Sequence, residues 1–443
     1  MEKFKNVIIG FGKGGKTLAK KLSSMGESVL VIEKSKKMYG GTCINIACLP
    51  SKNLILNAER GVEFTEAINT KNELTSFLRN KNYHMVADEA TAQVLDGNAK
   101  FISNDVIEIT LENGEKVQVT GERIFINTGA TPVIPNIEGI KESQNILDST
   151  AAMDLANLPK DLAIIGGGYI GLEFSEMFRK YGSNVTVLDI NTTFLPREDD
   201  DVAQMIFSDL KDEGITFELG AQVQKITDVD GKSVIIFEQD GRTKEVKVDK
   251  ILVASGRKPA TTNLGLENTD IKVDDRGAVV IDDQLKTSVD NVWAIGDVKG
   301  GLQFTYISLD DFRIIMNQLY GDNSRRVSDR TIVPYSVFIN PPLSNVGLNE
   351  KQAKAQGKSY KLYKQLVAAV PKARVIGDTR GIYKVLVDET TNEILGATIY
   401  GEESHEVINL ITLAMKAKLP YTMLRDQIYT HPTMAEALND VLK

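Results

Sequence analysis

Two short runs of apolar residues each lead into a glycine-rich turn and then into a helical pattern. The first run is Val7-Ile8-Ile9, and it enters a G-x-G-x-x-G turn whose glycines are Gly10, Gly12 and Gly15. A second apolar strand covers residues 28–32 and ends at Glu33. This order of strand, turn, helix and strand predicts a parallel βαβ unit.

The same pattern recurs in the middle of the chain. An apolar strand over residues 162–165 enters a second G-x-G-x-x-G turn, which contains Gly166, Gly168, Tyr169 and Gly171. The next strand covers residues 184–188 and ends at Asp189. In both copies the acidic residue lies 18 positions after the last glycine. We therefore interpret the chain as carrying a duplication.

Each part of such a unit has a physical task in binding a dinucleotide. The first glycine permits the tight turn, the second lets the backbone approach the pyrophosphate, and the third lets helix and strand pack closely. The helix N-terminus offers free N–H groups to the phosphates, and the acid accepts hydrogen bonds from a ribose diol. The alternative for each copy is an ordinary strand-to-helix turn. Two copies in register predict two dinucleotides, such as a flavin and a nicotinamide.

Later strands continue the repeat before the pattern changes. Three apolar strands end at small or acidic residues: residues 123–127 at Thr128 and Gly129, residues 251–254 at Ser255 and Gly256, and residues 292–296 at Asp297. From about Val333 onward, strands are followed by helical segments over residues 403–418 and 434–442. We therefore predict a separate C-terminal domain after the duplicated part.

Composition narrows the function classes. The 443 residues are 42% hydrophobic and 25% charged, which is typical of a globular protein of about three domains. With 52 basic and 60 acidic residues the net charge is −8, so nucleic acid and anionic membranes are poor partners. No apolar stretch of about 18 residues and no signal-peptide core occur, which favours the cytoplasm. Three histidines leave little material for a metal site, and we expect none.

The only cysteines, Cys43 and Cys48, lie five positions apart. In an ideal helix, residues at this spacing have Cα atoms about 8 Å apart, whereas a disulfide needs roughly 4.4–6.8 Å. A bond between them therefore requires a non-ideal or helix-initiating segment. Pro50 suits the first turn of a helix, which would place Cys48 near a helix N-terminus that stabilises a thiolate. The alternative is a pair of buried structural cysteines.

The segment Gly40-Gly41-Thr42-Cys43-Ile44-Asn45-Ile46-Ala47-Cys48-Leu49-Pro50-Ser51-Lys52 resembles the redox-active segment of the class I flavoprotein disulfide reductases. This is the family of glutathione reductase, dihydrolipoamide dehydrogenase and mercuric reductase. The resemblance covers the whole chain, including both glycine-rich turns, Gly296-Asp297 and His431-Pro432-Thr433. It implies an α/β fold of two Rossmann-like dinucleotide-binding domains, for FAD and NAD, with a C-terminal α+β dimerisation domain.

The family pattern also implies domain boundaries and cofactor sites. The FAD domain would comprise residues 1–147 and 266–330, the NAD(P)H domain residues 148–265, and the dimerisation domain residues 331–443. The FAD site would use Gly10, Gly12, Gly15, Glu33, Thr42, Lys52, Thr128, Gly129 and Asp297. The nicotinamide dinucleotide would be held by Gly166, Gly168, Tyr169, Gly171, Asp189 and Gly256.

Catalytic roles follow from the same resemblance. Cys43 would be the interchange thiol that attacks substrate, and Cys48 the charge-transfer thiol against the flavin. Lys52 and Glu173 look like the ion pair beside the flavin; the alternatives are a solvated lysine and a surface acid. In a homodimer, His431 would be the acid–base residue supplied by the other subunit, and Glu436 would orient it.

The acid at Asp189 predicts the nicotinamide cofactor. A carboxylate there accepts a ribose 2′-OH and repels a 2′-phosphate. No arginine or lysine occurs from Asp189 to Pro196, and the first is Arg197. We therefore expect NADH to be preferred, with some use of NADPH.

The number of cysteines and a resemblance to one branch of the family reduce the set of candidate substrates. The chain lacks the C-terminal cysteine pair of mercuric reductase and the redox tail of large thioredoxin reductases. Residues 304–311 resemble the bacterial reactive-chlorine-resistance and hypothiocyanous acid reductases. The implied substrate is a small oxidant, hypothiocyanous acid. Two alternatives stay open: a reductase of glutathione disulfide or a lipoyl group, and a redox- or metal-sensing binding protein without catalysis.

Overall fold

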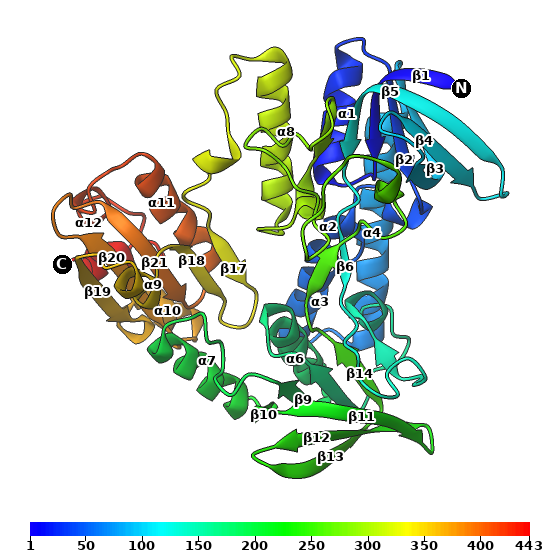
Figure 1. Ribbon diagram of the computed structural model, residues 1–443. Coiled ribbons are helices and arrows are strands. Elements are labelled where there is room, and N and C mark those ends of the chain that lie inside the picture. Colours follow the sequence, from blue (N-terminus) through cyan, green and yellow to red (C-terminus); the bar gives the residue numbers. More distant parts are fainter. The chain divides into compact units, whose positions relative to one another are not determined.

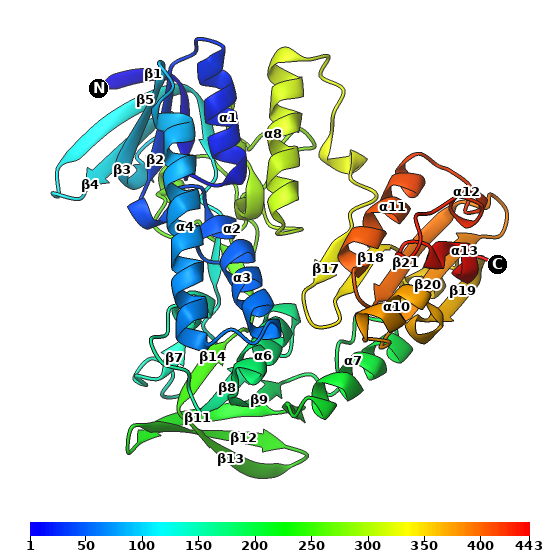
Figure 2. The ribbon, with the colours of Figure 1, turned by 180° about the vertical axis from the view of Figure 1, so that it is seen from behind.

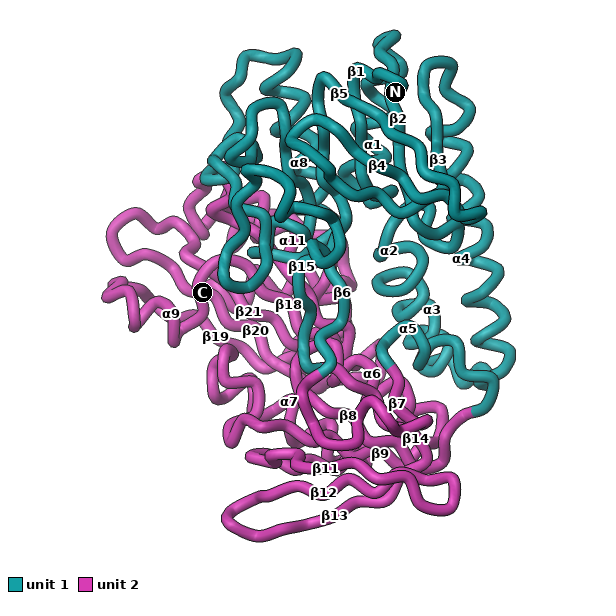
Figure 3. Tube along the Cα trace, turned by 45° about the vertical axis from the view of Figure 1, so that its right-hand side comes forward, with its two compact units in different colours: residues 1–134, 148–157, 255–329 teal, residues 135–147, 158–254, 330–443 magenta.

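The computed structural model describes residues 1–443, which form two compact units (Figure 3). Unit 1 comprises residues 1–134, 148–157 and 255–329, and unit 2 comprises residues 135–147, 158–254 and 330–443. Each unit is therefore assembled from segments that are distant in the chain. None of the helices combines the length and the apolar character that crossing a membrane requires.

The centre of unit 1 is a parallel sheet in the order β3-β2-β1-β5-β16, and β4 joins the outer parts of β3 and β5 as an antiparallel extension (Figure 1). Its strands are β1 (Glu2–Ile9), β2 (Val29–Glu33), β3 (Ala92–Phe101), β4 (Val106–Leu111), β5 (Lys116–Ile126) and β16 (Val292–Ala294). A separate ribbon pairs β6 (Ala130–Pro132) with β15 (Arg257–Pro259). The first glycine-rich turn leaves β1 beside the end of β5.

The apolar runs of the first βαβ unit are buried on both faces of this sheet. Ile8 packs in the cluster with Leu18 and Ile314, whereas Val7 and Ile9 pack in the opposite cluster with Ile107. A strand that is covered on both faces consists of consecutive apolar residues. This is why Val7-Ile8-Ile9 shows no alternation of apolar and polar positions.

The helices of unit 1 include the cysteine segment and hold it in place. They are α1 (Lys13–Ser24), α2 (Thr42–Asn45), α3 (Cys48–Glu59), α4 (Phe64–Ala87), α5 (Ser149–Ala152) and α8 (Thr305–Tyr320). Helix α1 packs against α8, and α2 and α3 both lie along the long helix α4 (Figure 2). The cysteine segment is thus held between well-packed helices.

Unit 2 contains a second parallel sheet, in the order β10-β9-β8-β14-β7. Its elements are β7 (Ile146–Leu147), β8 (Asp161–Ile165), α6 (Tyr169–Tyr181), β9 (Asn184–Asp189), α7 (Asp200–Asp212), β10 (Thr216–Leu219) and β14 (Lys250–Val253). A three-stranded antiparallel sheet packs on it through Ile235 and Phe237, and its strands are β11 (Gln222–Val229), β12 (Lys232–Gln239) and β13 (Arg242–Val248).

The C-terminal part of unit 2 is an antiparallel sheet in the order β17-β18-β21-β20-β19. Its strands are β17 (Tyr335–Val337), β18 (Leu343–Gly347), β19 (Tyr360–Leu366), β20 (Ile382–Asp388) and β21 (Ile394–Tyr400). Its helices are α9 (Glu350–Ala355), α10 (Pro371–Ile376), α11 (Ser404–Lys416), α12 (Thr422–Arg425) and α13 (Ala437–Val441). Helix α11 covers β18 and β21.

Candidate active site

The first glycine-rich turn is built around the side chain of Asn127, which directly follows β5. Gly15 N donates to Asn127 Oδ1 at 2.9 Å, and Asn127 Nδ2 donates to Ile295 O at 2.9 Å. Gly10 has φ +102°, and a Cβ there would lie 2.4 Å from Asn127 O. A Cβ at Gly12 would lie 2.6 Å from Asn127 Oδ1. The turn therefore needs glycine at these positions. Asn127, which organises the turn through its side chain, carried no signal in the sequence.

Glu33 lies at the end of β2, beside this turn. Phe11 N donates to Glu33 Oε2 at 2.9 Å, and Ser35 N donates to Glu33 Oε1 at 3.2 Å. Burial raises the pKa of Glu33, and the two backbone donors oppose that rise. The predicted acid is thus fixed next to the turn that it was expected to serve.

A second group of predicted FAD residues gathers where β5 and β16 end. Thr128 Oγ1 is buried and has no hydrogen-bond partner within the protein. Gly129 has positive φ, and no atom lies within 4 Å of where its Cβ would be. Gly256, which follows β14 and was predicted for the nicotinamide site, has the same open backbone. An orphaned hydroxyl and open glycine backbones suit a bound polar cofactor. Thr128 and Gly129, with the glycine turn and Glu33, fit FAD.

Asp297 follows β16 in the same region. Burial raises the pKa of its carboxyl, and the charges of Arg257 and Lys299 act in the opposite direction. Arg257 Nη2 donates to Ala130 O at 2.6 Å, which fixes the guanidinium beside the β6–β15 ribbon. Asp311 Oδ2 accepts from Gly296 N at 2.6 Å, so the turn that carries Asp297 is anchored to α8. Neither Arg257 nor Asp311 stands out as a site residue in the sequence.

The cysteine segment is a broken helix. Helix α2 spans only Thr42–Asn45, and α3 begins at Cys48 after extended φ values at Ile46 and Ala47. Gly41 has φ +86°, and a Cβ there would lie 2.7 Å from Gly12 Cα, so the segment lies directly against the first glycine turn. The expectation of a helix-initiating segment with Cys48 at its N-terminus agrees with this geometry.

The two thiols form one coupled pair. The S–H of Cys43 donates to the Cys48 sulfur, and this hydrogen bond, helped by the Lys52 charge, lowers the pKa of Cys48 to about 6. The same hydrogen bond and burial raise the pKa of Cys43. Thr305 Oγ1, at the start of α8, lies 3.8 Å from Cys48 Sγ. The pair therefore holds one thiolate and one thiol near neutral pH.

The second glycine-rich turn has the same construction in unit 2. Gly166 has φ +111°, and a Cβ at Gly171 would lie 2.0 Å from Gly166 O. Nothing lies within 4 Å of where a Cβ of Gly168 would be, so the backbone there is open. These features suit a second dinucleotide phosphate.

Asp189 and Tyr169 flank that turn. Asp189 Oδ1 accepts from Asn191 N at 3.1 Å, and a Cβ on Gly167 would lie 2.5 Å from Asp189 Oδ2. The hydroxyl of Tyr169 donates to Glu198, whose pKa is raised by burial. Glu198, which links Tyr169 to Tyr335 of β17, carried no signal in the sequence.

The remaining predicted catalytic residues lie in unit 2. Glu173 on α6 is buried and accepts from Phe338 N at 2.8 Å through Oε1. Its pairing with Lys52 of unit 1 stays a prediction. His431 Nδ1 lies 2.8 Å from Glu436 Oε2, so the structure brings these two residues together while the imidazole is exposed.

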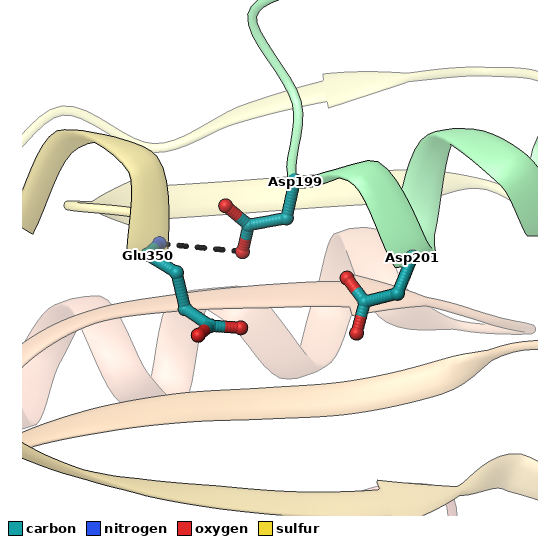
Figure 4. Close-up of side chains that lie close together, drawn as sticks. All are labelled: Asp199, Asp201 and Glu350. Carbon is teal, nitrogen blue, oxygen red and sulfur yellow. Dashed lines mark hydrogen bonds between the residues drawn. The ribbon is translucent and has the colours of Figure 1, made fainter. Parts of the chain in front are cut away.

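One cluster of carboxylates lies apart from these sites. Asp199, Asp201 and Glu350 converge from the starts of α7 and α9, and Glu350 N donates to Asp199 Oδ2 at 3.2 Å (Figure 4). The buried ammonium of Lys384 contacts all three carboxylates at 2.5–2.8 Å. Burial opposes the charge on Lys384, but these hydrogen bonds raise its pKa overall. We interpret the cluster as an ion network that ties α7 to the C-terminal sheet.

Known protein families and relatives match almost the whole length of the chain. Residues 4–311 match the pyridine nucleotide-disulphide oxidoreductase family, and residues 333–442 match its dimerisation domain. The probable pyridine nucleotide-disulfide oxidoreductase RclA of Escherichia coli strain K12 is 49% identical over 441 residues, which cover 100% of this chain and 99% of the relative. A mercuric reductase of Bacillus cereus is 32% identical over 450 residues, covering 98% of this chain and 70% of the relative.

Solved structures give the same result. The HOCl-induced flavoprotein disulfide reductase RclA from Escherichia coli matches with a TM-score of 0.95 at 49% identity, covering 99% of both chains. The Cu(II) complex of that protein matches with a TM-score of 0.96 at 48% identity, covering 100% of this chain and 99% of the other.

These matches confirm the resemblance to the disulfide reductases and to their reactive-chlorine branch. They also confirm the predicted fold class, with two dinucleotide-binding domains and a C-terminal dimerisation domain that supports a homodimer. The family implies FAD and a pyridine nucleotide as cofactors and chemistry at a sulfur group. The chain therefore belongs to the pyridine nucleotide-disulphide oxidoreductase family.

Proposed function

We propose that this protein is a reductase of hypothiocyanous acid that uses NADH and FAD and acts in defence against reactive chlorine species. The observation that carries the proposal is the hydrogen-bonded Cys43–Cys48 pair, in which the pKa of Cys48 is lowered to about 6 and the pKa of Cys43 is raised. The chain has no other cysteine. The similarity to an HOCl-induced reductase supports the choice of a small oxidant. The cytoplasm, the expected compartment, suits thiols that must be kept reduced.

The cofactor sites are proposed from the residues described above. Gly10, Gly12, Gly15, Glu33, Thr42, Lys52, Thr128, Gly129 and Asp297 would hold FAD. Gly166, Gly168, Tyr169, Gly171, Asp189 and Gly256 would hold the nicotinamide dinucleotide. Bound FAD would supply the transfer of an electron pair from NADH to the disulfide between Cys43 and Cys48. All further chemistry belongs to the side chains of the protein.

The two sulfurs reduce the oxidant in two displacements. Cys43, as thiolate, attacks the sulfur of hypothiocyanous acid; a Cys43 S–S bond forms, the S–O bond breaks, and hydroxide leaves as water after protonation. Cys48 thiolate then attacks the Cys43 sulfur and displaces thiocyanate, which restores the disulfide. Two thiols and one hypothiocyanous acid thus give one disulfide, thiocyanate, water and a proton. A thiol with a pKa of about 6 suits the resolving step because it stays ionised at neutral pH.

His431 of the partner subunit would manage the protons at Cys43 in the homodimer. Within the chain, Glu436 accepts from the imidazole and selects one tautomer, which leaves the other ring nitrogen for proton transfer. We expect Glu436→Gln to lower kcat, because a neutral amide can either donate or accept and no longer selects one tautomer of the imidazole. An unchanged kcat in the folded, FAD-containing variant would contradict this role.

Asp189 supports the preference for NADH. Its carboxylate is held by Asn191 at the end of β9, where such folds place the acid that accepts hydrogen bonds from a ribose diol. The test compares kcat/KM for the two cofactors. A preference for NADPH of about tenfold or more would refute this part of the proposal, since it would require a favourable site for the 2′-phosphate.

The cysteine scheme is tested with two single-cysteine variants. Cys43→Ser removes the attacking sulfur and should abolish turnover of hypothiocyanous acid while FAD remains bound. Cys48→Ser should allow one attack and then stall, because no resolving thiol remains. Full NADH-dependent turnover of hypothiocyanous acid by Cys43→Ser would contradict the cysteine scheme. Loss of FAD from the wild-type protein, or no bleaching of its colour by NADH, would instead favour a sensor without catalysis.

A further inference from the structure

Lys16 is a buried cation with no carboxylate partner. It lies on the first turns of α1, and only 4% of the residue is exposed. Its ammonium forms no ion pair with any carboxylate, and none contributes to its titration. Burial, together with the neighbouring Lys13 charge, lowers the pKa of Lys16 to about 8. An isolated buried charge is costly, so its position calls for a compensating partner.

The hydrogen bonds of Lys16 lead to the cysteine segment. Lys16 Nζ donates to Gly40 O at 3.1 Å and also to Asn82 Oδ1 on α4. The Asn82 amide is itself fixed, since its Nδ2 donates to Leu78 O at 2.7 Å. Gly40 has φ +94°, and a Cβ there would lie 2.1 Å from Ile44 Cδ1. The ammonium therefore joins α1, the glycine turn that opens α2, and α4.

The group of opposite charge that acts on Lys16 is Cys43, three positions after the Gly40 carbonyl to which the ammonium donates. The Lys16 charge lowers the pKa of the Cys43 thiol, and a Cys43 thiolate raises the pKa of Lys16. Cys48 acts in the other direction, because its hydrogen bond and its negative charge raise the pKa of Cys43. Ionising Cys43 next to a Cys48 thiolate would place two negative sulfurs side by side. A nearby buried cation reduces that cost.

The other polar groups around α2 do not replace this charge. Thr305 contributes a hydroxyl from α8 whose hydrogen bond lowers the pKa of Cys43 by more than the Lys16 charge does, but it supplies no charge. From α4, Arg79 Nε donates to Asn45 Oδ1 at 2.9 Å, at the opposite end of α2. Lys52 acts on Cys48. In the homodimer, His431 of the partner subunit would add a proton carrier but not a fixed charge.

We propose that Lys16 is a positioning residue for Cys43: it anchors the Gly40–Gly41 turn and supplies the buried positive charge that allows Cys43 to become the attacking thiolate. This inference deepens the proposed function and rests on the role of Cys43 given there. In the ordinary reading of the sequence, Lys16 is a solvated lysine on an amphipathic helix. The structure instead turns it inward, toward the reactive segment.

The test measures the ionisation of Cys43 directly. In the Cys48→Ser protein, purified with its FAD, Cys43 is the only thiol, and its rate of alkylation by iodoacetamide is followed against pH. An opposite charge close by shifts a pKa by about 1–3 units, so Lys16→Met should move the midpoint upward by about one unit. Alkylation below the midpoint should then slow about tenfold. Lys20→Met, which removes the same charge from the exposed side of α1, is the matched control and should leave the midpoint in place.

A second variant guards against misfolding. Lys16→Gln keeps a hydrogen-bond donor for Gly40 O without the charge, and it should show the same upward shift with normal FAD content. An unchanged midpoint in a folded Lys16→Met or Lys16→Gln protein would overturn the proposal, as would an equal shift in Lys20→Met. The assay contains no oxidant. A wild-type protein that fails to reduce hypothiocyanous acid would therefore refute the proposed function without altering this result.

Discussion

Removing the Lys52 ammonium should weaken the acidity of Cys48. The Cys48 pKa is lowered to about 6, first by the hydrogen bond from Cys43 and then by the Lys52 charge. A pKa of about 6 makes the thiol about 90% ionised at pH 7, whereas an ordinary cysteine with a pKa of about 8.5 is about 3% ionised. The depressed pKa means that the thiolate persists above about pH 6 and is lost below it.

The chain allows Cys48 to be titrated alone. In Cys43→Ser the serine hydroxyl can still donate to Cys48, so we expect the midpoint of its ultraviolet thiolate absorbance to stay well below about 8.5. Adding Lys52→Met should raise that midpoint by about one unit, since an opposite charge within a few ångströms shifts a pKa by about 1–3 units. Adding Lys20→Met instead serves as the control. A midpoint near 8.5 in Cys43→Ser, or no rise with Lys52→Met, would refute the electrostatic reasoning.

Two further predictions concern buried polar groups outside the cysteine pair. Asn127→Ala leaves Gly15 N and the Ile295 carbonyl without partners. The free energy of unfolding should therefore fall by about 1–3 kcal/mol for each lost hydrogen bond, and FAD should dissociate more readily. As the control, Asn98→Ala on the exposed face of β3 should change the free energy of unfolding by less than about 0.5 kcal/mol. An equal effect of both in denaturant titrations would contradict the role of Asn127. Lys384→Met removes the buried cation that three carboxylates share and should cost about 3–5 kcal/mol. Lys364→Met removes only the exposed cation beside Asp201 and should cost under about 1 kcal/mol. Similar melting points for the two variants would argue against a buried ion network.

The parts of the fold that sequence could predict are those set by local chemistry. The apolar runs and glycine turns predicted both parallel units because strand, tight turn and helix follow one another within about thirty residues. Pro50 indicated the start of α3 for the same reason, as its fixed φ suits a first helical turn. Such signals survive because tertiary contacts reinforce them rather than override them.

The residues that sequence missed act across distant segments. Asn127 looks like the last polar residue of a strand, and its role depends on β5 lying beside β1. Lys16 sits among lysines on a helix that is half exposed, and only the packing of α4 and the Gly40 turn shows that it points inward. Glu198 connects Tyr169 to Tyr335, far along the chain. A single sequence holds no record of these pairings.

The most direct test of the central claim is NADH consumption by the purified protein with hypothiocyanous acid, measured beside glutathione disulfide and lipoamide under the same conditions. The account predicts fast turnover with hypothiocyanous acid alone, dependent on both Cys43 and Cys48. Turnover with glutathione disulfide or lipoamide, and none with hypothiocyanous acid, would contradict it and assign the cysteine pair to a disulfide substrate.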